Sequence, residues 1–507
     1  MNLKVNPQHY LNSADMTQHI LLYTDNPPEG GVQQYNHSIL CGLVSAGYTV
    51  TSVQMKQSNL LVRQQKELGI KQFWLNFNLT TDFARVLKDI QQPKQIFSTT
   101  KPDLVIFSDG WPLANFAAKQ AAIDLAIPYI SVLGVVEPFP RDFAFEDGVP
   151  YIDVMSYHYT QAKAVIAVSQ NNLNILHDIF QFPAETGRVI HYGRPPQYFD
   201  TPVLSVRQKL RQEWKIPEDA VVCFTAARLS KIKGYEYQIE AIKLLKESPI
   251  WDQIYFVWAG TGEGDYYNCE AELKASVEEL GLTEHVNFLG RRWDIPDLLD
   301  ASDVFILPSK VEGMPLCIME AMAKGLIVIA SAVSGIPEQL GNTGKLLPDP
   351  NVDPEGTAKE LANTLLAWVL NKETLLERGQ ACQQRATKMF TEERMLRKYL
   401  EVIKQALSAE PEIQNVSKSI QQLENRVHYG SLVWDAWCSY RQGDSGEMAL
   451  YLEKSLKYTP FLPTETVLNW LANFENFSRG KGEYFDPESL NNLSEWEWRL
   501  GRICLGV

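Results

Sequence analysis

The 507-residue sequence lacks the features that mark several large classes of protein. Its seven cysteines are scattered, and no two are spaced C-x-x-C, which excludes a zinc ribbon and argues against a disulfide framework. No apolar run approaches the roughly 18 to 20 residues that a transmembrane helix requires, and the N-terminal stretch has no apolar core of a secretory signal. The net charge of −14 leaves no basic stripe for a nucleic acid. We therefore expect a cytoplasmic protein, with peripheral attachment to the inner face of the membrane left open.

What the sequence does contain is two series of short apolar runs, separated by helical patterns. Continuous apolar runs of this kind indicate parallel strands covered by helices on both faces. The pattern predicts an α/β protein with two doubly wound, Rossmann-like domains facing a cleft, whose ligands bind at the C-terminal ends of the strands. The runs are 19–24, 48–53, 102–107, 128–133 and 164–169 in the first series, and 220–226, 254–260, 286–290, 303–308 and 326–331 in the second.

Prolines and changes of pattern mark the boundaries between these parts. Pro195, Pro196 and Pro202 cluster after the predicted strand 188–193. The expected division is an N-terminal domain (1–198), a C-terminal domain (199–392), a closing helix (393–408), a linker (409–425) and a helical extension (426–507).

The extension contains SYRQGDSGEMALYLEKSLKYTP (439–460), whose spacing is typical of the second half of a tetratricopeptide repeat. Only one repeat is clear, whereas about three are usually needed for an independent solenoid. We expect a small helical appendage docked on the second domain. It is either a module for a protein partner or a structural cap, and the cap is slightly favoured because one clear repeat seldom stands alone.

The second domain carries the residues that indicate chemistry. Arg228 follows a predicted strand, and Lys233 comes five residues later, just before Gly234. A GTGEG turn (260–264) follows the next predicted strand, and VEGMPLCIMEAMAKG (311–325) places a loop before a helix. Two cations, a glycine turn and a helix N-terminus at one cleft suit a diphosphate. Arg228 and Lys233 alone would be weak evidence, since such residues after a strand are commonplace.

Glu312 and Glu320 flank the apolar run of that last segment. A carboxylate beside phosphates makes physical sense if it accepts hydrogen bonds from vicinal hydroxyls, as a ribose offers, and this is the role expected of Glu320. Glu312 would do the same for a second polyol such as a hexose. The simpler interpretation is a buried helix with one charge at each end. Cys317 lies between them without an activating base nearby, so we expect a small buried side chain.

The order RLSKIKG, VNFLG, DVFILPSKVEGMPLCIMEAMAKG and SGIPEQL resembles the C-terminal domain of retaining family-4 glycosyltransferases of the GT-B fold. The E-x7-E element and the Arg–Lys pair are specific in combination. PPEGGVQQYNHSI (27–39) is similar to the family's N-terminal glycine loop and first helix, and FTEERMLRKYLEVIKQAL (390–407) is similar to its closing helix. The resemblance covers roughly residues 18–408.

The resemblance implies a role for each matching residue. Arg228 and Lys233 would stabilise the leaving diphosphate, Glu320 would bind the ribose, and Glu312 would bind the transferred sugar. The backbone amides of Gly313, Met314 and Leu316 would face the donor, while Pro315 has no N–H to offer. Gly30 and Gly31 would approach the phosphate from the first domain, although an ordinary turn there is also compatible with the sequence.

One position departs from the family. A histidine often follows the strand that corresponds to 129–133, but here the chain reads GVVEPFP (134–140). Glu137 is the candidate replacement, or the role is vacant. The departure leaves the identity of the sugar open.

The resemblance thus implies a retaining glycosyltransferase that moves a sugar from a nucleoside-diphosphate donor to an unknown acceptor, whether glycan, lipid, small molecule or protein. No Asp-x-Asp motif is present, so neither a metal nor another cofactor is expected. The loop DGWP (109–112) is the candidate acceptor loop. Two alternatives are a GT-B nucleotide-sugar epimerase, which needs no acceptor, and a non-catalytic sugar-nucleotide scaffold whose helical extension binds a partner.

Overall fold

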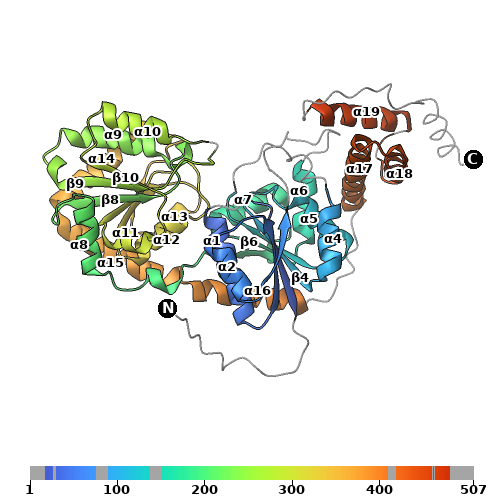
Figure 1. The fold of residues 1–507 in the computed structure, drawn as a ribbon, viewed down its shortest axis with the longest axis horizontal. Coiled ribbons are helices and arrows are strands. Elements are labelled where there is room, and N and C mark those ends of the chain that lie inside the picture. Colours follow the sequence, from blue (N-terminus) through green and yellow to red (C-terminus); the bar gives the residue numbers. More distant parts are fainter. Residues whose placement is uncertain are drawn as a thin grey trace, which may run out of the picture.

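The computed structural model describes residues 18–26, 30–75, 89–136, 151–265, 267–408, 418–459, 461 and 463–479 (Figure 1). Two parallel sheets form the centres of two α/β domains, as the sequence predicts. None of the helices in these ranges is long and apolar enough to cross a bilayer. Glu137 lies outside the described residues.

The first domain contains a parallel sheet in which the described strands run in the order β3-β2-β1-β4-β5-β6-β7. Its central strands are apolar and almost fully buried, because helices cover both faces. The strands are β1 (His19–Tyr23), β2 (Thr49–Met55), β3 (Lys71–Leu75), β4 (Leu104–Asp109), β5 (Tyr129–Leu133), β6 (Ala164–Ala167) and β7 (Gly187–Val189). The helices are α1 (Gly31–Ser45), α2 (Leu60–Glu67), α4 (Gln91–Thr100), α5 (Phe116–Asp124), α6 (Tyr151–Gln161) and α7 (Gln170–Phe180).

The second domain repeats this plan, with its described strands in the order β10-β9-β8-β11-β12-β13. Its strands are β8 (Val221–Ala226), β9 (Ile254–Ala259), β10 (Val286–Gly290), β11 (Val304–Leu307), β12 (Ile327–Ser331) and β13 (Lys345–Leu347). Its helices are α8 (Leu204–Glu213), the 3-10 turn η3 (Lys231–Lys233), α9 (Tyr235–Lys246), α10 (Glu270–Glu279), α11 (Ile295–Asp300), α12 (Leu316–Ala323), α13 (Ile336–Leu340), α14 (Pro354–Leu370) and α15 (Lys372–Met389).

Each sheet has one point at which the order of its strands reverses. That point lies between β1 and β4 in the first domain and between β8 and β11 in the second. Loops leaving adjacent strands there turn to opposite faces, which opens a crevice at the strand C-termini. The predicted cationic and glutamate residues of the second domain follow β8 and β11.

Two strands, β3 and β13, were not expected from the sequence. Both lie at a sheet edge, and β13 has only three residues. Strand β3, KQFWL, has only one fully buried residue, Leu75. Edge strands of this kind need little apolar sequence because one side pairs with no neighbour.

Helix α16 (Glu392–Ser408) returns the chain from the second domain to the first. It packs against α1, where the hydroxyl groups of Tyr399 and Tyr35 form a buried hydrogen bond. The main hydrophobic cluster includes Tyr399 and Ile403 of α16 together with residues of both sheets. The closing helix therefore fixes the two domains to each other.

The C-terminal extension consists of α17 (Lys418–Arg441), α18 (Ser445–Ser455) and α19 (Pro463–Arg479). Helix α17 begins inside the stretch expected to be a linker. The prediction that the extension docks on the second domain is wrong: α17 packs against α6 of the first domain, on the side facing away from the second (Figure 1). The apolar periodicity of a helix reports that one face is buried but not which surface buries it.

Candidate functional site

The two cationic residues of the candidate site, Arg228 and Lys233, lie in the segment that follows β8. Lys233 ends the turn η3, and its ammonium nitrogen lies 2.6 Å from Oε1 of Glu312. The same oxygen accepts a hydrogen bond of 2.8 Å from the Ser309 hydroxyl. Because Glu312 follows β11, this ion pair spans the crevice between β8 and β11.

Gly234, directly after Lys233, is required by the backbone. It has a φ of +71°, and a Cβ atom at this position would lie 1.9 Å from the carbonyl oxygen of Pro308. Only glycine fits such a close approach without strain. The β8 loop is therefore pressed against the end of β11, which holds Lys233 beside Glu312.

Arg228 occupies a more open position. Its guanidinium forms an ion pair with Asp265, and its side chain is about half exposed, at 51%. The Ser230 hydroxyl donates to the other oxygen of Asp265 at 2.9 Å. Asp265 thus orients Arg228, a function that no sequence motif indicated.

The GTGEG turn supports this loop and offers fewer amides than expected. The N–H of Gly262 donates to the Glu270 carboxylate at 2.8 Å, so it is already occupied. A Cβ on Gly260 would lie 1.9 Å from the carbonyl oxygen of Ala227, next to Arg228. The glycines therefore allow close packing of two loops, and the expectation that this turn serves the diphosphate gains no support from the contacts.

Helix α12 begins at Leu316, after Pro315, and no side chain caps its N-terminus. Helix α1 begins at Gly31, after Gly30, and is likewise without a side-chain cap. The two helix starts meet, since a Cβ on Gly31 would lie 3.3 Å from Cδ1 of Leu316. Two uncapped N-termini that converge from different domains form a favourable environment for an anion.

Gly313 brings the domains into backbone contact. A Cβ there would lie 1.7 Å from the carbonyl oxygen of Gly134, which follows β5 in the first domain. The carbonyl of Gly313 accepts a hydrogen bond of 3.0 Å from the N–H of Gly335. The neighbouring Met314 is buried, so this stretch can present only its backbone to a ligand.

Glu320 lies on α12 and contacts a residue that the sequence analysis missed. Its Oε1 atom lies 2.6 Å from Nη2 of Arg194, and both side chains are nearly buried. Arg194 belongs to the segment that links the domains. Nothing in the sequence pairs this arginine with a glutamate 126 positions later.

Cys317 is a partly buried thiol that packs against the main hydrophobic cluster, rather than the fully buried side chain expected. Burial is the largest cause that raises its pKa well above the ordinary value, with Glu312 and Glu320 adding to the effect. A thiol held neutral in this way is a poor nucleophile.

The crevice of the first domain contains a buried polar network around the DGWP loop. Asp109 forms an ion pair of 2.8 Å with the buried Lys119. The N–H of Asn115 donates to Asp25 at 2.7 Å, and its side chain donates to Asp109 at 2.7 Å. Burial raises the pKa of Asp25 to about 7 and that of Asp109 to about 6. Lys119 thus pairs with Asp109, while Asn115 donates to both buried carboxylates.

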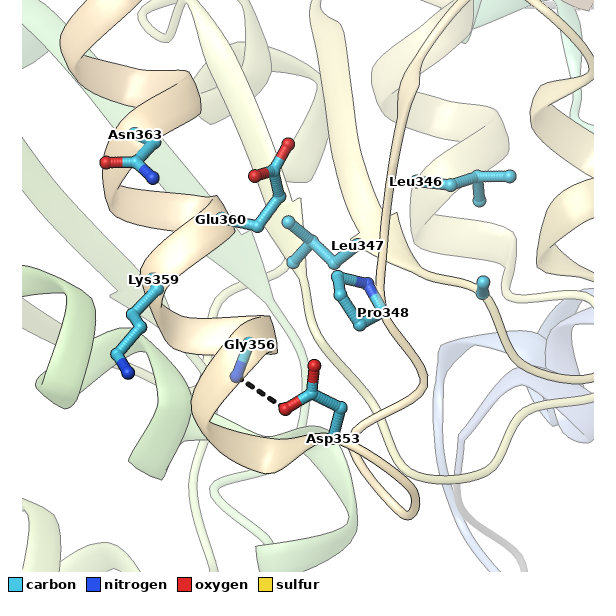
Figure 2. A pocket seen from close by; sticks show the side chains of 9 residues that line it. Leu346, Leu347, Pro348, Asp353, Gly356, Lys359, Glu360 and Asn363 are labelled. Carbon is cyan, nitrogen blue, oxygen red and sulfur yellow. Dashed lines mark hydrogen bonds between the residues drawn. The ribbon is translucent and has the colours of Figure 1, made fainter.

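A separate hollow lies on the second domain between β13 and α14 (Figure 2). None of the nine residues that line it belongs to the site described above. Its polar groups are already engaged: Asp353 accepts the N–H of Gly356 at 2.8 Å, Lys359 pairs with Glu355, and Glu360 pairs with Lys345. We give this hollow no functional role.

Among the described residues, no group of three or more His, Cys, Asp and Glu side chains is arranged to hold a metal ion. Metal independence stays a prediction.

Two family models match the chain, one in each domain. Residues 29–198 match the model described as Glycosyltransferase Family 4, and residues 206–389 match Glycosyl transferases group 1. The chain is 35% identical over 196 residues to the amylovoran biosynthesis glycosyltransferase AmsK of Erwinia amylovora, an alignment that covers 36% of this chain and 42% of AmsK. The chain thus aligns with less than half the length of this curated relative.

Solved structures share the fold over most of the chain. A glycosyltransferase from Rickettsia africae has a TM-score of 0.64 and 22% identity, covering 78% of this chain and all of that one. HepE of Anabaena, solved in complex with UDP and glucose, has a TM-score of 0.63 and 21% identity, covering 77% of this chain and all of HepE. At this level of identity the likeness concerns the GT-B fold.

Proposed function

We propose that this chain, whose two α/β domains match the models of Glycosyltransferase Family 4 and of the group 1 glycosyl transferases, is a retaining, metal-independent glycosyltransferase. It transfers a sugar from a nucleoside-diphosphate donor to an acceptor hydroxyl. The observation that carries the proposal is the convergence of the Lys233–Glu312 pair with the uncapped starts of α1 and α12. Such an arrangement provides fixed positive charge where a diphosphate would leave.

Each group has a distinct task. Lys233 and Arg228 stabilise the negative charge that develops on the diphosphate as its bond to the sugar breaks. The acceptor hydroxyl attacks from the face that the diphosphate leaves, and a phosphate oxygen takes up the hydroxyl proton. Glu312 holds hydroxyl groups of the transferred sugar, and Glu320 holds those of the ribose. The protein thereby contributes position and electrostatics, and no carboxylate needs to form a covalent bond.

Glu312 and Lys233 lie in direct contact. Both groups can exchange this contact for better partners, since a diphosphate is a stronger ligand for an ammonium group and sugar hydroxyls can donate to a carboxylate.

The acceptor binds at the crevice of the first domain, beside the DGWP loop. This loop is firmly held, because the Pro112 carbonyl accepts from Tyr159, the Ala114 carbonyl accepts from Lys119, and the Gly110 amide donates to Asn26. It is also close to the donor side, since the amide of Gly134 donates to the Asp109 carbonyl and Gly134 contacts Gly313. We propose a carbohydrate acceptor, in line with the polysaccharide named for AmsK.

A thermal-unfolding screen of UDP-, GDP- and ADP-sugars tests the donor site. A donor present at 100 times its dissociation constant should stabilise the chain by about 2.7 kcal/mol. UDP-glucose is the first candidate, because the related fold of HepE was solved with UDP and glucose. The shift should be the same in EDTA and in magnesium. Stabilisation that needs magnesium would contradict metal independence, and a screen without any shift would contradict the donor site.

A further inference from the structure

Arg194 stands at the junction of the two domains. It follows β7, and its backbone pairs with the segment that leads into α16: its N–H donates to the Phe390 carbonyl at 2.8 Å, and its carbonyl accepts from Glu392 at 3.0 Å. Its side chain is only 5% exposed. Both chain segments that cross between the domains therefore hold this residue.

The guanidinium of Arg194 reaches into both domains. Nη2 lies 2.6 Å from Oε1 of Glu320 on α12 and 2.9 Å from the side-chain oxygen of Gln34 on α1. The ring of Tyr198 lies 4.7 Å from the guanidinium carbon. Nε is buried and donates to no group in the described part of the chain. Nη2 of Arg194 thus links Glu320, the residue proposed to bind the ribose, to α1, the helix that begins at the glycine loop.

We propose that Arg194 is a positioning residue that sets the orientation of Glu320 for the ribose and transmits nucleotide binding to the Gly30–Gly31 loop. This inference rests on the proposed function, which assigns the ribose hydroxyls to Glu320. The nucleotide site of the second domain and the glycine loop of the first then respond to each other through the contact Glu320–Arg194–Gln34.

The geometry gives the link its mechanism. Arg194 contacts Oε1 of Glu320, and Tyr198 interacts with both side chains, so the plane of the carboxylate is fixed. The planar guanidinium forms directional hydrogen bonds, so a shift of the carboxylate on ribose binding shifts the donor it shares with Gln34. Gln34 lies three residues after Gly31, in the first turn of α1.

A second interdomain contact provides a matched control. Oε1 of Glu338, on α13, lies 2.7 Å from Nε2 of His191, and Oε2 accepts the N–H of Gln170 at 2.6 Å. This contact also joins the two domains, three residues before Arg194, but it involves none of the residues assigned to the donor. Its loss disturbs the domain interface without disturbing Glu320.

The first test measures the affinity for the tightest-binding of UDP, GDP and ADP by titration calorimetry. Arg194→Met should weaken binding roughly 10- to 100-fold, the range expected for a lost hydrogen bond to a charged group. Arg194→Lys should fall between Arg194→Met and wild type. The double variant Arg194→Met/Glu320→Gln should bind the nucleotide less weakly than the product of the two single effects predicts, since both substitutions remove the same Arg194–Glu320 contact. His191→Gln should stay within about threefold of wild type.

The second test measures transmission by hydrogen exchange of the α1 amides. The nucleotide should slow exchange in wild type and in His191→Gln, but not in Arg194→Met. Gln34→Leu should bind the nucleotide nearly normally and yet lose this protection, because it breaks only the second half of the link. If Arg194→Met does not fold, Arg194→Lys and Gln34→Leu decide the question.

Wild-type affinity and wild-type protection of α1 in Arg194→Met would overturn the inference, as would an equal loss in His191→Gln. Wild-type protection in Gln34→Leu would also overturn it. In each of these cases the proposed donor site would stand, provided that Glu320→Gln weakens binding. A wild-type protein that binds none of the three nucleotides would overturn the proposed function and this inference together.

Discussion

At the scale of single residues, the charges of the two crevices are buried in pairs. Lys233 with Glu312, Arg194 with Glu320 and Lys119 with Asp109 each place opposite charges within 3 Å in positions with little access to solvent. Removing one partner leaves the other unpaired, which is more costly than removing both. Substitutions at these positions therefore need a measure of folding beside any measure of activity.

Lys233→Ala tests the cation at the leaving group. Turnover should fall roughly 10²- to 10³-fold, because fixed charge at a developing anion is worth this much in active sites. Lys231→Ala is the matched control: it removes an ammonium group two positions earlier that pairs with Glu272 on the surface. Steady-state turnover and a thermal-unfolding curve of both variants check the prediction. Near-normal turnover in folded Lys233→Ala protein would argue against the site.

Asp25 predicts an unusual dependence of stability on pH. Burial raises its pKa to about 7, above the value near 4 of an unfolded chain. The folded state therefore holds a proton that the unfolded state has lost between these values, and Asp25 adds stability at low pH that is lost as the pH rises through 7. The nearby His158 acts in the opposite sense, since burial lowers its pKa.

A comparison with Asp25→Asn reports on this carboxyl group together with its repulsion of Asp109, whose pKa is also raised by burial. The difference in free energy of unfolding, wild type minus variant, should decrease by roughly 1 kcal/mol per pH unit between pH 5 and 7. Denaturant unfolding at several pH values measures it. A difference that is independent of pH would show that Asp25 does not titrate in this range.

At the scale of elements, the loop before α12 and the helix itself present different carboxylates. Glu312 lies on the loop, beside Lys233 and Ser309, whereas Glu320 lies on the helix and turns toward Arg194. Glu312 and Glu320 are thus eight positions apart, one before the start of α12 and one on it, and they contact different partners. This separation matches a donor with two polyol parts.

The division of roles can be measured with two conservative variants. Glu320→Gln should weaken binding of the free nucleoside diphosphate, since the loss of a hydrogen bond to a charged group costs about 1.5–3 kcal/mol. Glu312→Gln should bind the same nucleotide normally and transfer the sugar poorly. Titration calorimetry and a transfer assay on both proteins separate the effects. Equal losses of nucleotide affinity would rule out the division.

At the scale of the whole molecule, the helical extension is a body with its own core. Among the described residues, the buried members of its apolar cluster all lie on α17, α18 and α19 and include Trp434, Trp437 and Trp470. Two of its contacts with the first domain are polar: Nε2 of His428 lies 3.7 Å from Oδ1 of Asp124, and Nε2 of Gln91 lies 3.5 Å from Oδ2 of Asp435. A separate core is what a module for a partner requires, but the choice between module and cap stays a prediction, as does the likeness to a tetratricopeptide repeat.

Removal of residues 418–507 tests this interpretation. The truncated protein should stay soluble and bind the nucleotide within about twofold of the full chain, because α17 packs against α6, which carries none of the residues assigned to the donor. Transfer to the natural acceptor should fall if the extension recruits it. Size-exclusion chromatography followed by titration calorimetry gives the answer. Aggregation of the truncated protein would instead support a structural cap, now over the first domain.

The sequence by itself determined the two-domain α/β architecture and the positions of its central strands along the chain. Runs such as those of β4 and β12 are apolar because both faces of a parallel sheet are covered, so local composition records the fold. The spacing of Arg228, Lys233, Glu312 and Glu320 also indicated a donor site, since these residues follow the strands that flank one crevice. The edge strands β3 and β13 escaped because an edge position demands little of the side chains.

Only the tertiary structure decided which residues face each other across long stretches of chain. It paired Arg194 with Glu320, Arg228 with Asp265 and Asp109 with Lys119, and it placed the extension on the first domain. The physical reason is that a charged side chain or an apolar helix face specifies the kind of partner it needs but not its position in the chain. Packing selects that partner once the sheets and helices have come together.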